Sequence, residues 1–243
     1  MNVWRGLIKN LRECLFPVFC LGCSIEGEWY CEKCFKELKN FGVFYCPVCH
    51  SKNSDGSPCN NCQVTTSLNR VVAFFDYEEK SIFGRLIKHF KYDFAYDIES
   101  VWKKIIQRYL ENIFKKLEIE GESLVIVPVP LHPRRLRERG FNQAEIIGRI
   151  IFEQLQKFNK NEVIFEVNGL RRTRVTSQQA KLNRVERIAN IKNAFVWKGK
   201  NLDNKAVILV DDVYTSGSTM NECGRILKLA NVKGVFGLAL GRD

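Results

Sequence analysis

Four pairs of cysteines, each with a spacer of two residues, constrain the fold of this chain more than any other feature. They occupy the first quarter of the 243-residue sequence, where nine of its ten cysteines precede residue 63. The short spacer lets both thiolates of a pair turn toward one ion, and two pairs complete the tetrahedral sulfur set of a structural zinc site. We therefore predict two structural Zn²⁺ ions, held by Cys20, Cys23, Cys31, Cys34, Cys46, Cys49, Cys59 and Cys62.

The pattern leaves the pairing of these ligands open. Sequential pairing would give two consecutive zinc ribbons, whereas pairing of the first with the third pair would give a cross-brace. A catalytic zinc is disfavoured, because a closed four-thiolate site leaves no position for water. His50 follows a cysteine pair and is an alternative ligand, although we expect it to be exposed. Cys14 and Cys223 lie at apolar helix positions, and we expect them to be buried thiols.

The cysteine-rich region is short of long apolar segments, so metal binding would supply most of its folding free energy. A stretch of strand composition, residues 70–77, follows it and leads into an apolar helical segment at 82–90. We therefore divide the chain near residue 66. Residues 1–66 would form an N-terminal helix, over 2–16, and a double zinc-ribbon module, and residues 67–243 a second domain.

Apolar strands alternate with amphipathic helices in this second domain, and the whole chain has an ordinary globular composition, 45% hydrophobic and 27% charged. The pattern predicts strands at 124–130, 163–167, 206–210 and 235–240, and helices at 98–117, 142–158 and 220–230. Continuously apolar strands separated by helices indicate a parallel sheet covered on both faces. The predicted fold class is therefore α/β.

Residues 207–219 (VILVDDVYTSGST) carry the clearest binding motif. The apolar strand delivers Asp211 and Asp212 to the sheet edge where open α/β folds bind ligands. These carboxylates are placed to accept hydrogen bonds from vicinal ribose hydroxyls. The following turn into a helix offers hydroxyls and backbone N–H groups to a phosphate, through Thr215, Ser216, Gly217, Ser218 and Thr219. The alternative is that the acidic pair merely ends a strand and a hydroxyl caps the helix, but the length of the pattern disfavours it.

The charge of the chain, +11, favours polyanionic partners: nucleic acid, an anionic membrane or phosphorylated small molecules. Residues 131–192 hold 14 Lys or Arg and 6 Asp or Glu, a local surplus of eight. No apolar run approaches the roughly 20 residues that span a bilayer, so we expect no membrane span. Basic residues interrupt the N-terminal stretch, unlike a signal peptide, and we expect a cytoplasmic protein.

Three segments carry a resemblance to known proteins. Residues 207–219 resemble the 5-phosphoribosyl-1-pyrophosphate (PRPP) motif of type I phosphoribosyltransferases. Residues 127–145 (VPVPLHPRRLRERGFNQAE) lie where those enzymes place a pyrophosphate loop, and residues 171–190 where they place a flexible loop that closes over the ligand. With the cysteine pairs and the Phe90-Lys91-Tyr92 segment, the chain from residue 20 to 240 resembles the ComF/ComFC (GntX-like) competence family.

The resemblance implies a zinc ribbon fused to a type I phosphoribosyltransferase domain, in a bacterial protein that handles incoming single-stranded DNA during natural transformation. A helicase-like competence ATPase would be its partner, and PRPP, carried with Mg²⁺, its ligand. Asp211 and Asp212 would then contact the ribose 2′- and 3′-hydroxyls, and residues 215–219 the 5′-phosphate. The pyrophosphate and flexible loops would contribute Val129, Pro130, Leu131, His132, Arg134, Arg135 and Arg172.

Single-stranded DNA binding needs a basic groove that follows the phosphates and aromatic faces on which bases stack. The predicted phosphate contacts are Arg135, Arg137, Arg139, Arg174, Arg184 and Arg187. The candidates for stacking are Phe41, Phe44, Tyr45, Phe141 and Tyr214. The same arginines could instead bind pyrophosphate, or could be solvated loop charges.

Three functions stay open at this point, and the sequence assigns no catalytic residue. The PRPP site is either a binding or regulatory site of a DNA-handling protein, or the site of an active phosphoribosyltransferase with an unidentified acceptor. In such an enzyme, positioning and electrostatics would carry the catalysis. Because 24 residues follow Thr219, we expect any hood over the acceptor to come from residues 70–97. An adaptor with a degenerate second domain is disfavoured by the intact acidic pair and loop.

Overall fold

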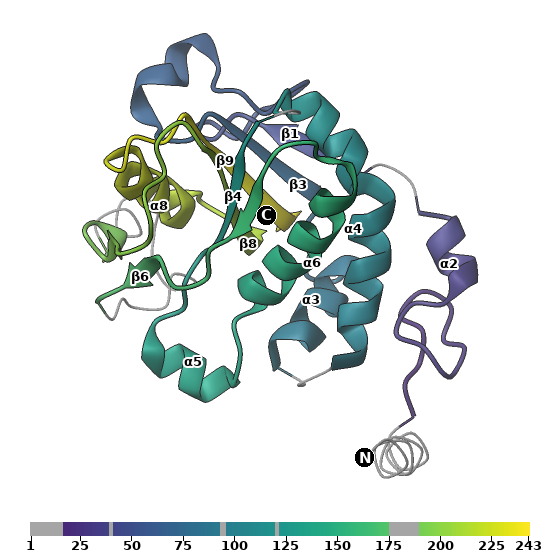
Figure 1. Ribbon diagram of the computed structural model, residues 1–243. Helices are drawn as coiled ribbons and strands as arrows, with labels where there is room; N and C mark the ends of the chain where they lie inside the picture. Colours follow the sequence, from purple (N-terminus) through teal and green to yellow (C-terminus); the bar gives the residue numbers. More distant parts are fainter. Residues whose placement is uncertain (1–16, 39–40, 93–95, 120–121, 175–189) are drawn as a thin grey trace.

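The computed structural model describes residues 17–38, 41–92, 96–119, 122–174 and 190–243 (Figure 1). The predicted helix at 2–16 lies outside the described residues. A seven-stranded sheet has the strand order β2-β1-β3-β9-β8-β4-β5, and a second sheet pairs β6 with β7. The strands are β1 (Val43–Tyr45), β2 (Lys52–Asn53), β3 (Arg70–Asp76), β4 (Leu124–Pro128), β5 (Val163–Phe165), β6 (Leu170–Arg172), β7 (Phe195–Trp197), β8 (Ala206–Tyr214) and β9 (Gly234–Arg242).

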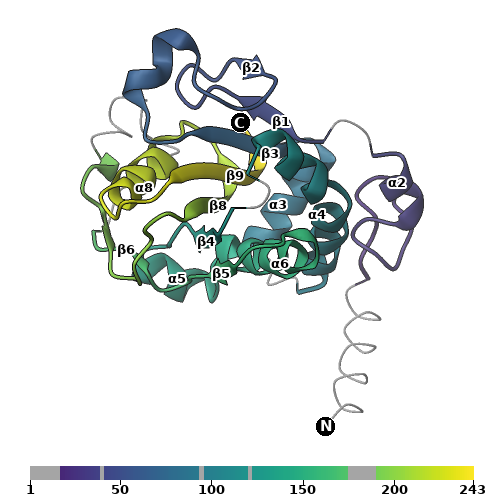
Figure 2. The same cartoon turned by 45° about the horizontal axis from the view of Figure 1, so that its top comes forward.

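The strands from β3 to β5 in this order are mutually parallel, as the sequence predicts, while β1 and β2 add an antiparallel edge. Helices α3 (Ile82–Tyr92), α4 (Tyr96–Leu117) and α6 (Gln143–Phe158) lie on one face of the sheet, and α8 (Ser218–Lys228) lies on the other (Figure 2). The remaining described helices are short: α2 (Glu32–Lys36), α5 (Pro133–Arg139) and a 3₁₀ helix (Asn60–Thr65). No described helix is both long and apolar enough to cross a bilayer.

The alternation of side chains along β8 explains why the sheet is covered on both faces. Ile208 and Val210 are fully buried with the residues of α4 and α6, whereas Val207 and Leu209 are fully buried with those of α8. Burial of every second side chain against a helix layer is the main stabilisation of such a sheet. The apolar run thus fixes β8 at the centre of the fold and directs its carboxyl end to one sheet edge.

Several elements depart from the predicted pattern. β8 continues to Tyr214, beyond residue 210, because its pairing with β9 extends to Tyr214 and Arg242. A helix, α5, replaces the expected basic loop: His132 caps its first turn, Pro133 occupies a first-turn position, and Gly140 ends it at φ 80°. No residue of α5 is buried, so its sequence has no apolar periodicity that would reveal it.

The two cysteine-rich segments contact different parts of the fold. In the first, Leu21 accepts a hydrogen bond from Arg85 of α3, and Phe35 accepts one from Arg108 of α4. The second segment follows β1 directly and includes β2, and β1 pairs with β3 of the large sheet. The division of the chain at residue 66 stays a prediction, although strands on either side of it share one sheet.

Candidate functional site

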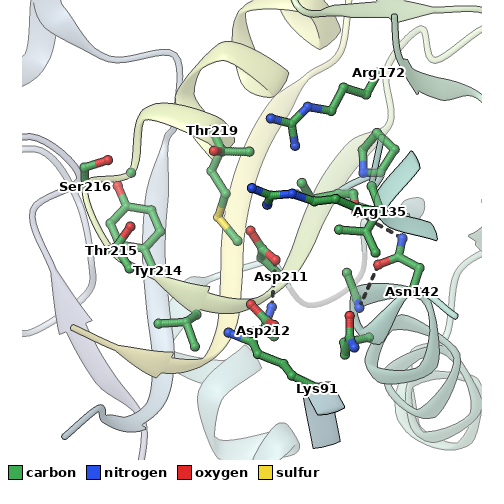
Figure 3. A pocket seen from close by; sticks show the side chains of 18 of the residues that line it. Lys91, Arg135, Asn142, Arg172, Asp211, Asp212, Tyr214, Thr215, Ser216 and Thr219 are labelled. Carbon is green, nitrogen blue, oxygen red and sulfur yellow. Dashed lines mark hydrogen bonds and ion pairs between the residues drawn. The ribbon is translucent and has the colours of Figure 1, made fainter. Parts of the chain in front are cut away.

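A cavity of about 420 Å³ opens at the carboxyl ends of β4 and β8 (Figure 3). Residues after β4 form one wall, the turn between β8 and α8 forms another, and α3, α5, α6 and β6 each contribute side chains. This is the edge where parallel α/β sheets bind ligands. The cavity is lined by the two predicted carboxylates, by cationic side chains and by the predicted phosphate loop.

Asp211 and Asp212 reach the cavity from β8 and lie beside Lys91 of α3 (Figure 3). The Lys91 ammonium is 3.1 Å from Asp212 Oδ2, and the backbone N–H of Asp212 donates to Asp211 Oδ1 at 2.8 Å. Burial, and then the adjacent Asp212 charge, raise the pKa of Asp211 well above its usual range. Burial alone would lower the pKa of Lys91, but the two carboxylates outweigh it and raise that pKa.

The turn between β8 and α8 has the geometry of an anion cradle. Gly217 caps α8 at φ 69°, a left-handed conformation that favours glycine, and Ser216 Oγ and Ser218 Oγ share a hydrogen bond of 2.9 Å. Thr215, Ser216, Gly217 and Thr219 line the cavity. Ser218 is not among the lining residues and is 8% exposed, so its side chain supports the turn instead. The N-terminus of α8 points its dipole at this turn, which favours a negative charge there.

The predicted pyrophosphate residues that follow β4 fall into two groups, those that line the cavity and those that do not. Val129, Pro130, Leu131 and Arg135 line the cavity. His132 and Arg134 do not line it. His132 Nδ1 accepts from the backbone N–H of Arg134 as the cap of α5, and the Arg134 side chain pairs with Glu138 at 3.0 Å. These two residues therefore build the helix that presents Arg135.

Two guanidinium groups, of Arg135 and Arg172, project over the carboxylates (Figure 3). Burial, and then the like charge of Arg135, lower the pKa of Arg172. Burial has already removed part of the water around these two cations, so binding of an anion costs them less solvation than it would cost two fully exposed cations. The cavity thus offers hydrogen-bond acceptors on β8 and cations across from them, which suits a phosphorylated sugar.

Seven further residues line the cavity that the sequence analysis assigned to neither PRPP nor DNA: Lys91, Asn142, Gln143, Ala144, Val213, Met220 and Asp243. Lys91 lies within residues 70–97, from which any hood over an acceptor was expected to come. No motif or spacing in the sequence identifies it as a site residue. Asn142 was expected only as the start of a helix. Its Oδ1 accepts from Ala144 N at 3.1 Å, and its Nδ2 donates to Val129 O at 3.1 Å, so it joins α6 to the loop after β4.

The predicted DNA contacts are distributed unevenly. Arg135 and Arg139 of α5 line the cavity, while Arg137 of the same helix is exposed outside it. The Arg174 guanidinium donates to two backbone carbonyls, Asn190 O at 2.9 Å and Lys192 O at 3.0 Å. Arg184 and Arg187 lie outside the described residues.

The expectation of exposed stacking rings is wrong for three of the five aromatic residues. Phe44, Tyr45 and Tyr214 are each 3% exposed or less, so they present no face to a base. Phe41 stacks on Tyr109 at 3.9 Å between ring centroids, and Phe141 packs against Phe90 at 6.0 Å. Composition could not separate these packed rings from exposed ones.

The cysteines gather into two clusters with sequential pairing. The ligand atoms of Cys20, Cys23, Cys31 and Cys34 lie within 4.8 Å of one another, and those of Cys46, Cys49 and Cys59 do the same. Sulfurs at this spacing fit a zinc ion in each cluster. Burial would raise the pKa of Cys20, but backbone N–H groups of Cys31, Cys23 and Gly22 outweigh it and lower the pKa to about 6. Such a thiolate is ready to bind metal.

Cys62, His50 and Cys223 are outside these two groups of ligand atoms. Cys62 is not in the second group, yet it lies near it: burial raises its pKa, and Cys46 and Cys49 raise it further. His50 is half-buried against Tyr214, with ring centroids 5.9 Å apart, rather than exposed. Cys223 is fully buried as expected, and Cys14 lies outside the described residues.

The chain is similar to known proteins over nearly its whole length. The phosphoribosyl transferase domain family matches residues 97–240. Competence protein F of Haemophilus influenzae is 30% identical over 92% of this chain and 97% of that protein. Competence protein ComFC of Streptococcus pneumoniae is 28% identical over 89% of each chain, and DNA utilization protein YhgH of Escherichia coli is 28% identical over 87% of this chain and 91% of that protein. The chain therefore belongs to the ComF family of competence proteins, and residues 97–240 are its phosphoribosyltransferase domain.

Proposed function

We propose that this protein handles incoming single-stranded DNA in natural transformation and carries a PRPP-binding site in its phosphoribosyltransferase domain. The observation that carries the ligand proposal is the opposition of two carboxylates and two guanidinium groups across one cavity that ends at the N-terminus of α8. A cytoplasmic location and a helicase-like competence ATPase as partner belong to the same proposal.

PRPP would use each wall of the cavity. Asp211 and Asp212 would accept hydrogen bonds from the ribose hydroxyls, and residues 215–219 would receive the 5′-phosphate. Arg135 and Arg172 would bind the pyrophosphate, since guanidinium groups match phosphate oxygens in geometry. The carboxylate oxygens at the cavity also suit the hard cation Mg²⁺, which, bound to the PRPP oxygens, would screen the pyrophosphate charge.

The lining of the cavity favours a binding or regulatory site over transfer to a base. Among the described residues that line it, Tyr214 is the one aromatic residue, and it is 2% exposed. The described lining thus offers no ring face on which a base would stack. An active phosphoribosyltransferase with an unidentified acceptor is the second candidate, which the intact acidic pair favours because both carboxylates reach the cavity.

The DNA proposal is supported by α5, which lies on the border of the cavity. Arg135 and Arg139 of this helix line the cavity, whereas Arg137 is exposed to solvent outside it. Arginines on one exposed helix supply the sequence-independent phosphate contacts that single-stranded DNA binding needs. A ligand in the cavity would change the charge presented by the same helix, so the two sites would be coupled.

The direct test is fluorescence anisotropy of a labelled single-stranded oligonucleotide titrated with zinc-loaded protein, with and without Mg-PRPP. We expect salt-sensitive DNA binding and a shift of the dissociation constant when Mg-PRPP is added. No DNA binding in either condition would overturn the DNA-handling proposal. Release of pyrophosphate in a parallel screen of nucleobases would then support the transferase.

A further inference from the structure

Tyr214 connects the second cysteine cluster, of Cys46, Cys49 and Cys59, to the proposed phosphate-binding turn, residues 215–219. It is the last residue of β8 and is 2% exposed. Its hydroxyl donates to the backbone carbonyl of Pro47 at 3.0 Å. Pro47 lies between Cys46 and Cys49, so the acceptor of this buried hydrogen bond belongs to a turn of the second cysteine cluster.

The same hydroxyl lies against the phosphate-binding turn. A Cβ atom placed on Gly217 would be 2.1 Å from Tyr214 Oη and 2.5 Å from Cζ, so the tyrosine ring occupies the space beside this glycine. Gly217 is the N-cap of α8 and lies in the middle of residues 215–219. Tyr214 is therefore packed directly between the cysteine turn and the backbone that would receive the phosphate.

Neighbouring groups hold the ring from other sides. The His50 ring meets it edge-on at 5.9 Å, and the Arg242 guanidinium lies 5.9 Å from its centroid. The Tyr214 carbonyl accepts from Asp243 N at 3.1 Å. The cysteine turn has its own backbone bonds, from His50 N to Cys46 O at 3.1 Å and from Cys46 N to Ser51 O at 2.9 Å. The position of Pro47 is thus tied to the geometry of the cluster.

We infer that Tyr214 is a positioning residue for the phosphate-binding turn, and that metal binding by the second cluster controls ligand affinity through it. This inference rests on the proposed PRPP site. A metal ion on Cys46 and Cys49 fixes the turn that carries Pro47, and Pro47 fixes the tyrosine beside Gly217. Loss of the metal frees the two thiols, so the Pro47 carbonyl no longer holds the tyrosine in register. The second cluster and the phosphate-binding turn are therefore coupled through Tyr214.

The chain offers a matched control for the hydrogen bond. The hydroxyl of Tyr30, which is 5% exposed, donates to the backbone carbonyl of Cys34 at 3.1 Å in the first cluster, away from the cavity. On zinc-loaded full-length protein, Tyr214→Phe should weaken Mg-PRPP binding roughly fivefold by calorimetry, the effect of one net hydrogen bond. It should also speed hydrogen exchange of residues 215–219. Tyr30→Phe should change neither.

Removal of one metal ligand tests the cluster itself. Cys49 and Cys23 are both exposed, and each belongs to a different cluster. Cys49→Ser and Cys23→Ser should each lower the bound zinc, measured by mass spectrometry, but Cys49→Ser alone should speed exchange in residues 215–219. Equal rates of hydrogen exchange at residues 215–219 in the two cysteine variants, together with unchanged Mg-PRPP affinity in Tyr214→Phe, would overturn the inference. Wild-type protein that binds no Mg-PRPP would instead overturn the proposed function, while hydrogen exchange would still report on the tyrosine.

Discussion

The ammonium of Lys91 lies 3.1 Å from Asp212 Oδ2, so a residue of α3 supplies the counter-charge for a carboxylate of β8. The exposed fractions of the two side chains are 21% and 14%. Most of the pair is therefore shielded from water, where an ion pair is screened less than on the surface. Lys91 holds Asp212 in place and supplies a positive charge to the acidic pair, which prepares carboxylate oxygens to accept hydrogen bonds from hydroxyl groups.

Replacement of this lysine should weaken ligand binding in a pH-dependent way. In Lys91→Met the two carboxylates lose their counter-charge, so we expect the pKa of Asp211 to rise further and Mg-PRPP affinity at pH 7 to fall about tenfold, as for loss of a charged hydrogen bond. Calorimetry at higher pH should recover part of the affinity. Lys88→Met, on the exposed side of the same helix, is the control. Equal affinity for the two variants would contradict this role.

The raised pKa of Asp211 predicts that the free energy of unfolding falls as the pH rises. Burial raises the pKa of Asp211 in the folded state. Its contribution to stability is therefore fully present below the pKa that Asp211 has in the unfolded chain, and it is lost as the pH rises through the pKa of the folded state. Relative to Asp211→Asn, the wild type should therefore lose stability between pH 6 and pH 8, on the order of 1 kcal/mol. Urea unfolding at both pH values measures it. A difference that does not change with pH would disprove the assignment.

The arginines of α5 should separate DNA binding from ligand binding. Arg137→Glu should weaken single-stranded DNA binding and flatten its salt dependence while leaving Mg-PRPP affinity unchanged, because Arg137 lies outside the cavity lining. Arg135→Glu should weaken both. Lys228→Glu, at the exposed end of α8, makes the same charge change elsewhere. If the salt slope of Arg137→Glu equalled that of Lys228→Glu, α5 would not be the DNA surface.

The elements with a strong apolar pattern could be predicted from the sequence. α4 and α6 have wide buried faces, and β4 is buried at every residue, so the pattern reports their packing directly. The acidic pair and most of the phosphate turn could be placed for the same reason, since a buried parallel strand carries the residues at its carboxyl end to the sheet edge. α5 could not, because it buries nothing and is fixed by His132, Pro133 and Gly140 at its ends.

The side-chain partners that complete the site could not be read from the sequence. Lys91 meets Asp212 only because α3 packs near the carboxyl end of β8, across 121 positions of sequence. Tyr214 is aromatic and was a candidate for base stacking, yet it is 2% exposed and its hydroxyl donates to the carbonyl of Pro47, 167 positions away. Such contacts depend on how distant elements pack, and local periodicity carries no information about that.

Calorimetric titration of zinc-loaded protein with Mg-PRPP, for the wild type and Asp212→Asn, tests whether the cavity at the end of β8 binds PRPP. We expect saturable binding by the wild type and a loss of affinity of about tenfold or more in the variant, because the proposed acceptor of ribose hydroxyls is changed. The zinc content should be the same in both proteins, since Asp212 belongs to neither cysteine cluster. Equal affinity of the two proteins, or no binding by the wild type, would contradict the proposed PRPP site.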